Sequence, residues 1–219
     1  MIRTIVLAHG EQARFTGMLD RPKQLIDLGG ESIIARTVRL FRGHVDEVVV
    51  IAPWGGTVGP ARVEAIPYPG GTTLHGLHQT RHLWNDIDRL IVLLGDVVFS
   101  THTRDVVMAA RSLTFVGREG PNPLTGKPWG ELFALVCPRA AIAQLDAVLH
   151  EPHWQTAPGR LRDLAQFLRG CAVCPFAMTD IVNDYTDDID TPEDVEAVLP
   201  RLRTQARDDI GEPLTGVLR

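Results

Sequence analysis

The chain has 219 residues, of which 44% are hydrophobic and 22% charged, and its net charge is -5. This length suits one domain that buries roughly 70% of its unfolded surface, and the negative charge argues against nucleic-acid and anionic-membrane partners, because both need a basic surface. The sequence has no apolar run of membrane-spanning length and no signal-peptide pattern, and its three cysteines do not suit a disulfide framework, so a reduced cytoplasmic protein is expected.

Strand-like and helix-like patterns alternate along the chain. Apolar runs predict buried strands at 5–8, 48–52, 62–66, 90–94, 113–117 and 132–137. Apolar residues at helical spacing predict helices at 33–41, 74–82, 140–149, 161–168 and 195–202. The alternation predicts an α/β fold, a Rossmann-like three-layer α/β/α sandwich with a mixed, mostly parallel sheet. Residues 1–204 would form a single domain, and 205–219 a C-terminal tail or an arm of a homo-oligomer.

The loop after the first strand combines a glycine with two cations. It contains Gly10, Arg14 and Lys23. A glycine lets backbone N–H groups come close to an anion, and the cations neutralise its charge. We therefore expect a phosphate-binding loop here, although the same residues also occur in ordinary loops.

The clearest central strand, 90–94, ends at Gly95-Asp96. In open α/β sheets, ligands bind beyond the carboxyl ends of the strands, so Asp96 should lie beside the phosphate loop. Mg2+ typically uses one or two carboxylates together with substrate phosphates, which makes Asp96 a candidate magnesium ligand. The alternative is that Asp96 caps the next helix, but Thr101 or Thr103 is better spaced to do so.

The order of these residues resembles the signature L-A-A-G-x-G-x-R, followed by P-K and L, of sugar-1-phosphate, phosphocholine and molybdopterin (MobA-like) nucleotidyltransferases. The matching positions are Leu7-Ala8, Gly10, Arg14, Pro22-Lys23 and Leu25. Further on, Leu94-Gly95-Asp96 and the run from Asp190 to Asp194 also match. His9 and Gln12 depart from the signature, the latter at its second glycine.

The resemblance implies a GT-A-type fold and a Mg2+-dependent enzyme. Such an enzyme transfers a nucleoside monophosphate from an NTP to a small phosphorylated acceptor and releases pyrophosphate. Arg14 would neutralise the β and γ phosphates, and Lys23 would stabilise charge at the α-phosphate. Asp96 and Asp190 would hold the Mg2+.

The resemblance also implies a set of nucleotide-binding residues. Backbone N–H groups of the first loop would cradle the triphosphate, and a Gly-Thr step would contact the base. The set is Leu7, Ala8, His9, Gly10, Glu11, Gln12, Gly71 and Thr72. Thr72 or Thr73 would serve equally well as the N-cap of the following helix.

The Gly/Pro-rich section 118–131 is expected to form the lip of the acceptor pocket. By resemblance, the acceptor-binding residues would be Arg118, Lys127, Gly130 and Glu131. The alternative is a solvated loop with one salt bridge. A sugar 1-phosphate is the first candidate acceptor and a phosphocholine-like alcohol phosphate the second. The molybdopterin branch comes last, because the ending I-D-T-P-E-D resembles the sugar-type enzymes.

Two other functions fit parts of the sequence. A GT-A glycosyltransferase would share the sheet, but it normally carries D-x-D where this chain has Asp96-Val97-Val98. A nucleotide-binding regulatory protein without catalysis would explain His9 and Gln12, but it would not need Arg14, Lys23, Asp96 and Asp190 together.

Three weaker patterns are expected to be structural. His75, His78 and His82 share a helical face without a carboxylate or cysteine that would complete a ligand set. Cys171 and Cys174 lie in an expected strand that points their thiols to opposite faces. Asp184, Asp187 and Asp188 are neighbours that could substitute for Asp190 as the second metal ligand, but they are expected to line a solvated loop.

Overall fold

The computed structural model describes residues 1–8, 22–66, 72–151, 154, 159–170 and 178–210, with no side-chain description for 178 and 205–210. The elements follow one another as β1 (Ile2–Leu7), the 3-10 turn η2 (Lys23–Leu25), α1 (Ile33–Arg42), β2 (Glu47–Ala52), β3 (Gly56–Val58), β4 (Ala61–Ala65), α2 (Thr73–Gln79), η3 (Arg81–Leu83), β5 (Arg89–Leu94), β6 (Val97–Val98), α3 (Thr101–Ala109), β7 (Thr114–Arg118), β8 (Glu131–Pro138), α4 (Arg139–Leu149), α6 (Leu161–Gly170), β9 (Met178–Ile181), β10 (Asp187–Asp188) and α7 (Pro192–Ile210).

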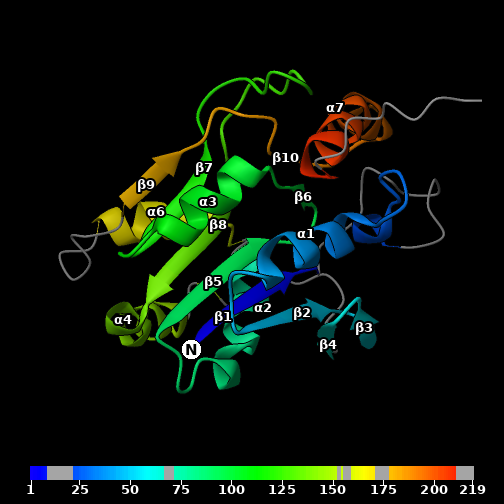
Figure 1. Cartoon of the computed structure of the whole chain (residues 1–219). Coiled ribbons are helices and arrows are strands. Elements are labelled where there is room, and N and C mark those ends of the chain that lie inside the picture. Colours follow the sequence, from blue (N-terminus) through cyan, green and yellow to red (C-terminus); the bar gives the residue numbers. More distant parts are fainter. Residues whose placement is uncertain (9–21, 67–71, 152–153, 155–158, 171–177, 211–219) are drawn as a thin grey trace, which may run out of the picture.

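Eight of the described strands form one large sheet in the order β3-β4-β2-β1-β5-β8-β7-β9 (Figure 1), and β6 and β10 form a separate two-stranded sheet. β1 pairs in parallel with β2 and β5, β2 with β4, and β7 with β9. β8 runs antiparallel to both β5 and β7, and β3 runs antiparallel to β4. The sheet is therefore mixed and mostly parallel, as predicted.

Helices cover both faces of the sheet. Successive strand residues point to opposite sides, so each apolar strand has side chains to bury on both faces. On β1, Ile5 and Leu7 belong to the core beneath α2, α4 and α6, whereas Val6 belongs to the core beneath α1 and α3. The central strands are buried on both faces, which explains why they read as unbroken apolar runs rather than as alternating patterns. The three-layer α/β/α arrangement is confirmed.

A third, smaller core lies where α7 packs against η2, α1 and the two short strands β6 and β10. Val198 and Leu202 of α7 are buried there with Ile33 and Val98. The helix continues to Ile210, past residue 204, where the domain was expected to end; the division into domain and tail stays a prediction. In the described part of the chain, no helix is long and apolar enough to cross a membrane.

Candidate functional site

Gly95 brings the ends of β1 and β5 into close contact. Its N–H donates to the carbonyl of Leu7 at 2.8 Å. A Cβ at this position would lie 2.8 Å from that carbonyl oxygen and 3.0 Å from Cα of Ala8, so any larger residue would push the two strand ends apart. Asp96 is thereby held beside the point where the chain enters the predicted phosphate loop.

One expected phosphate donor is already used within the sheet. The N–H of Ala8 donates to the carbonyl of Ile51 at 2.7 Å. The expectation that this amide would help to cradle a triphosphate is therefore wrong. Any backbone cradle must be formed by loop residues that follow it.

The short strands β6 and β10 join two segments that lie far apart in the sequence. They pair antiparallel, with Asp188 opposite Val97, and the N–H of Ile189 donates to the carbonyl of Asp96 at 2.9 Å. This pairing places Asp188 and Asp190 next to Asp96. The structure thus brings together the two aspartates that the sequence proposed as metal ligands.

Lys23 lies between those two carboxylates. Its Nζ is 2.7 Å from Oδ2 of Asp96 and 3.4 Å from Oδ1 of Asp190, and its side chain is only 8% exposed. Burial alone would lower the pKa of Lys23, but the attraction of Asp96, Asp190 and Asp188 outweighs it and raises the pKa. The ammonium group is therefore firmly charged and is positioned by η2.

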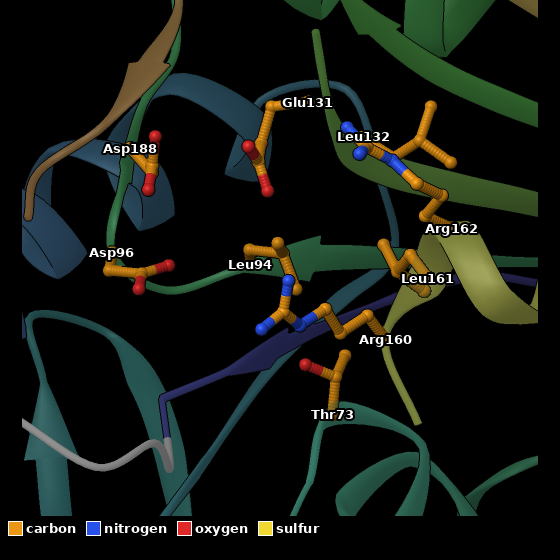
Figure 2. A pocket seen from close by; sticks show the side chains of 9 residues that line it. All are labelled: Thr73, Leu94, Asp96, Glu131, Leu132, Arg160, Leu161, Arg162 and Asp188. Carbon is orange, nitrogen blue, oxygen red and sulfur yellow. The ribbon is translucent and has the colours of Figure 1, made fainter. Parts of the chain in front are cut away.

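Asp188, given only as an alternative to Asp190 and otherwise expected in a solvated loop, belongs to this cluster. Its carboxyl group lines the cavity beside Asp96 (Figure 2). Burial, which disfavours the charged form, and the nearby charges of Asp190 and Asp96 raise the pKa of Asp188 to about 8, against the opposing effect of Lys127.

Lys127, expected to bind the acceptor, instead holds the chain around the cluster. Its Nζ donates to the backbone carbonyl of Asp188 and, at 3.0 Å, to that residue's Oδ1, and it lies 3.2 Å from Oδ2 of Asp194. Asp194 in turn accepts from the N–H groups of Asp190 and Thr191 at the start of α7, the pattern of a capping box. With these contacts and 10% exposure, Lys127 supports the aspartate segment and does not reach toward an acceptor.

Arg118, a second expected acceptor contact, is buried away from the cavity. Its Nη2 donates to Oδ1 of Asp187 at 2.8 Å, with side chains 1% and 0% exposed respectively. Its Nη1 donates to the carbonyls of Gly120 and Trp129. The expectation for Asp187 is wrong, because its carboxylate does not lie in solvent; the acceptor role of Arg118 stays a prediction. Together Arg118 and Asp187 anchor the segment that carries Asp188.

A cavity of about 180 Å³ opens beside the carboxylate cluster. β8 runs antiparallel to β5 and begins near the point where β5 ends, so Glu131 reaches the same edge of the sheet as Asp96. Burial raises the pKa of the Glu131 carboxyl group, against the opposing effect of Arg162. Figure 2 shows the carboxyl groups of Asp96, Asp188 and Glu131 and the guanidinium group of Arg160 directed toward the same space.

Arg160 and Arg162, which flank the start of α6, were not expected in the site. Arg160 is exposed, and its guanidinium group makes no hydrogen bond or ion pair with the described residues. Arg162 donates to the carbonyl of Gly130, which lies at the rim of the cavity. Cations are disfavoured at a helix N-terminus by the helix dipole, so two arginines at this position are a local conflict that could have marked a functional site.

The remaining candidate residues divide between described and undescribed parts of the chain. Thr72 is the N-cap of α2, where its hydroxyl accepts from the N–H of His75 at 3.2 Å, and Thr73 lines the cavity. The candidates that lie outside the described residues are His9, Gly10, Glu11, Gln12, Arg14 and Gly71.

The weaker patterns do not form metal sites in the described ranges. No group of three or more His, Cys, Asp or Glu side chains is arranged there to hold a metal ion. His82 contacts Glu64, and His78 packs edge-on against His150. Cys137 is buried, and its thiol donates to the carbonyl of Pro138 at 3.7 Å; Cys171 and Cys174 lie outside the described residues.

The sequence model of the MobA-like NTP transferase domain matches residues 4–165 of the chain. No curated protein matches the chain in sequence. The family model is named after the molybdopterin (MobA-like) branch, whose acceptor was placed last among the three candidates. The order of the candidate acceptors stays a prediction.

Among solved structures, three similar chains are described as nucleotidyltransferases or CTP transferases. The CTP:phosphocholine cytidylyltransferase from Streptococcus pneumoniae has a TM-score of 0.65 at 13% identity, over 92% of this chain and 99% of that chain. The inositol-1-phosphate CTP transferase from T. maritima has a TM-score of 0.66 at 14% identity, over 94% and 96%. A nucleotidyl transferase from Methanothermobacter thermautotroptrophicus has a TM-score of 0.66 at 20% identity, over 93% and 99%.

At these identities, the solved structures show a common fold. The family match covers well over half of the chain and lies with nucleotidyltransferases rather than with glycosyltransferases. The chain therefore belongs to the MobA-like NTP transferase domain family and is a nucleotidyltransferase.

Proposed function

We propose that this protein transfers a nucleoside monophosphate from an NTP to the phosphate group of a small acceptor, with Mg2+ and with release of pyrophosphate. The observation that carries the proposal is the meeting of Lys23, Asp96 and Asp190 at one edge of the sheet, with Nζ 2.7 and 3.4 Å from the two carboxylates. A cation and a pair of carboxylates at this edge suit a triphosphate with its metal ion.

In the proposed reaction, an oxygen of the acceptor phosphate attacks the α-phosphorus of the NTP. The new O–P bond forms as the bond between the α-phosphorus and the bridging oxygen breaks, and pyrophosphate leaves with that electron pair. The acceptor phosphate is already an anion near neutral pH, so no protein base is needed. Catalysis then depends on positioning and charge neutralisation, as in phosphoryl transfer generally.

Oxygen ligands suit Mg2+, and the carboxyl groups of Asp96, Asp188 and Asp190 lie together at this edge of the sheet. Asp96 and Asp190 would hold the ion, with Asp188 beside them. When bound, Mg2+ would supply charge neutralisation between nucleotide and acceptor. Lys23 would stabilise the α-phosphate, and Arg14 the β and γ phosphates.

The acceptor is proposed to lie in the cavity between the carboxylates and the start of α6. Arg160, whose guanidinium group has no partner among the described residues, would hold the acceptor phosphate. Glu131 and the backbone of Gly130 would contact acceptor hydroxyl groups. Thr72 and Gly71 would contact the base. A sugar 1-phosphate remains the first candidate and a phosphocholine-like compound the second.

The test is release of pyrophosphate in the presence of Mg2+, with each NTP in turn and a pool of sugar 1-phosphates and phosphocholine. Wild type and Asp96→Asn would be compared, with Asp105→Asn on the distant face of α3 as the control. We expect release that needs one NTP and one acceptor and that falls by roughly 10²–10³-fold in Asp96→Asn, the size of effect that loss of one transition-state contact produces.

Nucleotide binding, measured separately by calorimetry, separates the possible failures. If an NTP binds but no pair of NTP and acceptor releases pyrophosphate, the proposed transfer is excluded and a regulatory role is favoured. Release that is equal in wild type and Asp96→Asn would remove Asp96 from the metal site.

A further inference from the structure

A second cavity adjoins the cavity at the carboxylate cluster. This second cavity of about 210 Å³, here called the distal cavity, shares Glu131, Leu132 and Arg162 with the first as common walls. Small-molecule sites commonly occupy roughly 300–1,000 Å³. Neither cavity reaches that range by itself, but the two together do, which favours one ligand that spans both.

One wall of the distal cavity is a row of hydrogen-bond donors on α6. Arg162, Gln166 and Arg169 are spaced by four and three residues, so they lie on one face of the helix. Arg162 donates to the carbonyl of Gly130, and Arg169 donates to the hydroxyl of Thr179. A guanidinium group has five N–H donors, so most of this capacity remains.

The opposite wall supplies acceptors. Glu119 follows β7 and Glu131 begins β8, and both residues line the distal cavity, Glu131 between it and the first cavity. Among the described residues, neither carboxyl group forms a hydrogen bond or a close ion pair, and neither Arg162 nor Arg169 forms a close ion pair. Charged groups that line one cavity without a close ion pair keep hydrogen-bonding capacity for a ligand.

Hydroxyl groups match these two walls, because each hydroxyl both donates and accepts. An anionic ligand would be repelled by Glu119 and Glu131, and a quaternary ammonium would be repelled by Arg162 and Arg169. The described residues that line the distal cavity also include no aromatic ring, which a quaternary ammonium would use for cation–π contact. A neutral ligand rich in hydroxyl groups has no such conflict.

We propose that the acceptor carries a second polyhydroxylated unit, beyond the unit that bears the reacting phosphate, and that this second unit lies in the distal cavity. The inference rests on the proposed function. It distinguishes a disaccharide-like or polyol-extended phosphate from a single hexose 1-phosphate and from phosphocholine.

The test compares glucose 1-phosphate, maltose 1-phosphate and phosphocholine as acceptors for wild type, Arg169→Ala and Arg139→Ala. Arg139 is an exposed arginine at the start of α4, outside both cavities, and is the matched control. The measured quantity is the ratio of kcat/KM for maltose 1-phosphate to kcat/KM for glucose 1-phosphate, from pyrophosphate release.

We expect a ratio of about ten or more in wild type and an unchanged ratio in Arg139→Ala. In Arg169→Ala the ratio should fall by about tenfold, because the variant loses one hydrogen bond from a charged group. A wild-type ratio near one, or a ratio that Arg169→Ala leaves unchanged, would overturn the inference while the proposed transfer stands. A preference for phosphocholine would overturn it as well. If no acceptor supports release although an NTP binds, the proposed function fails, and the inference fails with it.

Discussion

The ammonium group of Lys23 lies 2.7 Å from the carboxylate of Asp96, at the place where the proposed Mg2+ ligands converge. A lysine and a metal ion at this place compete for the same negative charge. In the nucleotide-free protein, the lysine compensates the carboxylates. Once a nucleotide brings its phosphates, the same ammonium group can turn to them.

Lys23→Gln is therefore expected to tighten the binding of Mn2+, as a substitute for Mg2+, to the nucleotide-free protein. The substitution removes a competing charge next to Asp96 and Asp190, and we expect a gain of about tenfold, within the usual range of coupling between sites. Calorimetry measures the affinity, and Arg104→Gln on α3 is the control. An affinity that stays the same or weakens would show that the ammonium group does not compete.

Gly95→Ala is expected to lower the free energy of unfolding by about 1–3 kcal/mol, the usual effect of overpacking. The added Cβ would lie 2.8 Å from the carbonyl oxygen of Leu7. Gly43→Ala is the matched control, because Gly43 has φ of -69° and nothing lies within 4 Å of an added Cβ. Urea unfolding followed by circular dichroism measures both. Equal stability of the two variants would contradict the close approach of β1 and β5.

Asp187→Ala is expected to destabilise the fold by about 3–5 kcal/mol, because it leaves the buried charge of Arg118 without its carboxylate. Asp105→Ala removes the exposed partner of Arg104 and should cost about 1 kcal/mol or less. Thermal and urea unfolding provide the comparison. If Asp187→Ala left stability intact but raised KM for the acceptor, Arg118 and its partner would belong to the binding site after all.

Arg160→Gln is expected to raise KM for the acceptor by about tenfold, because it removes a charge-assisted hydrogen bond to the acceptor phosphate. The affinity for the NTP should stay within about twofold, since an exposed group away from the nucleotide changes little. Steady-state kinetics and calorimetry measure the two quantities, with Arg139→Gln as the control. An effect on NTP affinity alone would place Arg160 at the nucleotide instead.

His78 should make stability sensitive to mildly acidic pH. Burial, and then the charges of Arg81 and His150, lower its pKa below the usual 6.5, against a smaller opposing effect of Asp146. The unfolded chain then binds more protons than the folded one, so the free energy of unfolding falls as the pH drops through 6.5. Urea midpoints between about pH 5 and 7 should change less in His78→Gln than in wild type or in His102→Gln. Parallel curves for all three proteins would exclude His78 as the cause.

Much of the fold could be predicted from local patterns. Unbroken apolar runs such as 90–94 require burial on both faces of the sheet. Segments with apolar residues at helical spacing follow these runs, so a three-layer fold with a largely parallel sheet was expected. The motifs that end β1 and β5 also predicted the edge where Lys23 and Asp96 meet. Side chains whose partners lie far away in the sequence were harder to assign. Arg118 and Lys127 appeared to be loop cations, but their partners Asp187 and Asp188 come some sixty residues later.

The sequence by itself determined the class of sheet and predicted the edge at which Lys23, Asp96 and Asp190 meet, because these follow from short-range periodicity and from strand ends. The tertiary structure decided which carboxylate faces which cation. The pairing of β10 with β6 brings Asp188 beside Asp96, and the antiparallel start of β8 brings Glu131 opposite Arg160. Strand pairing and burial act between distant segments, so the roles of Arg118, Lys127 and Asp188 became visible only once the chain was folded.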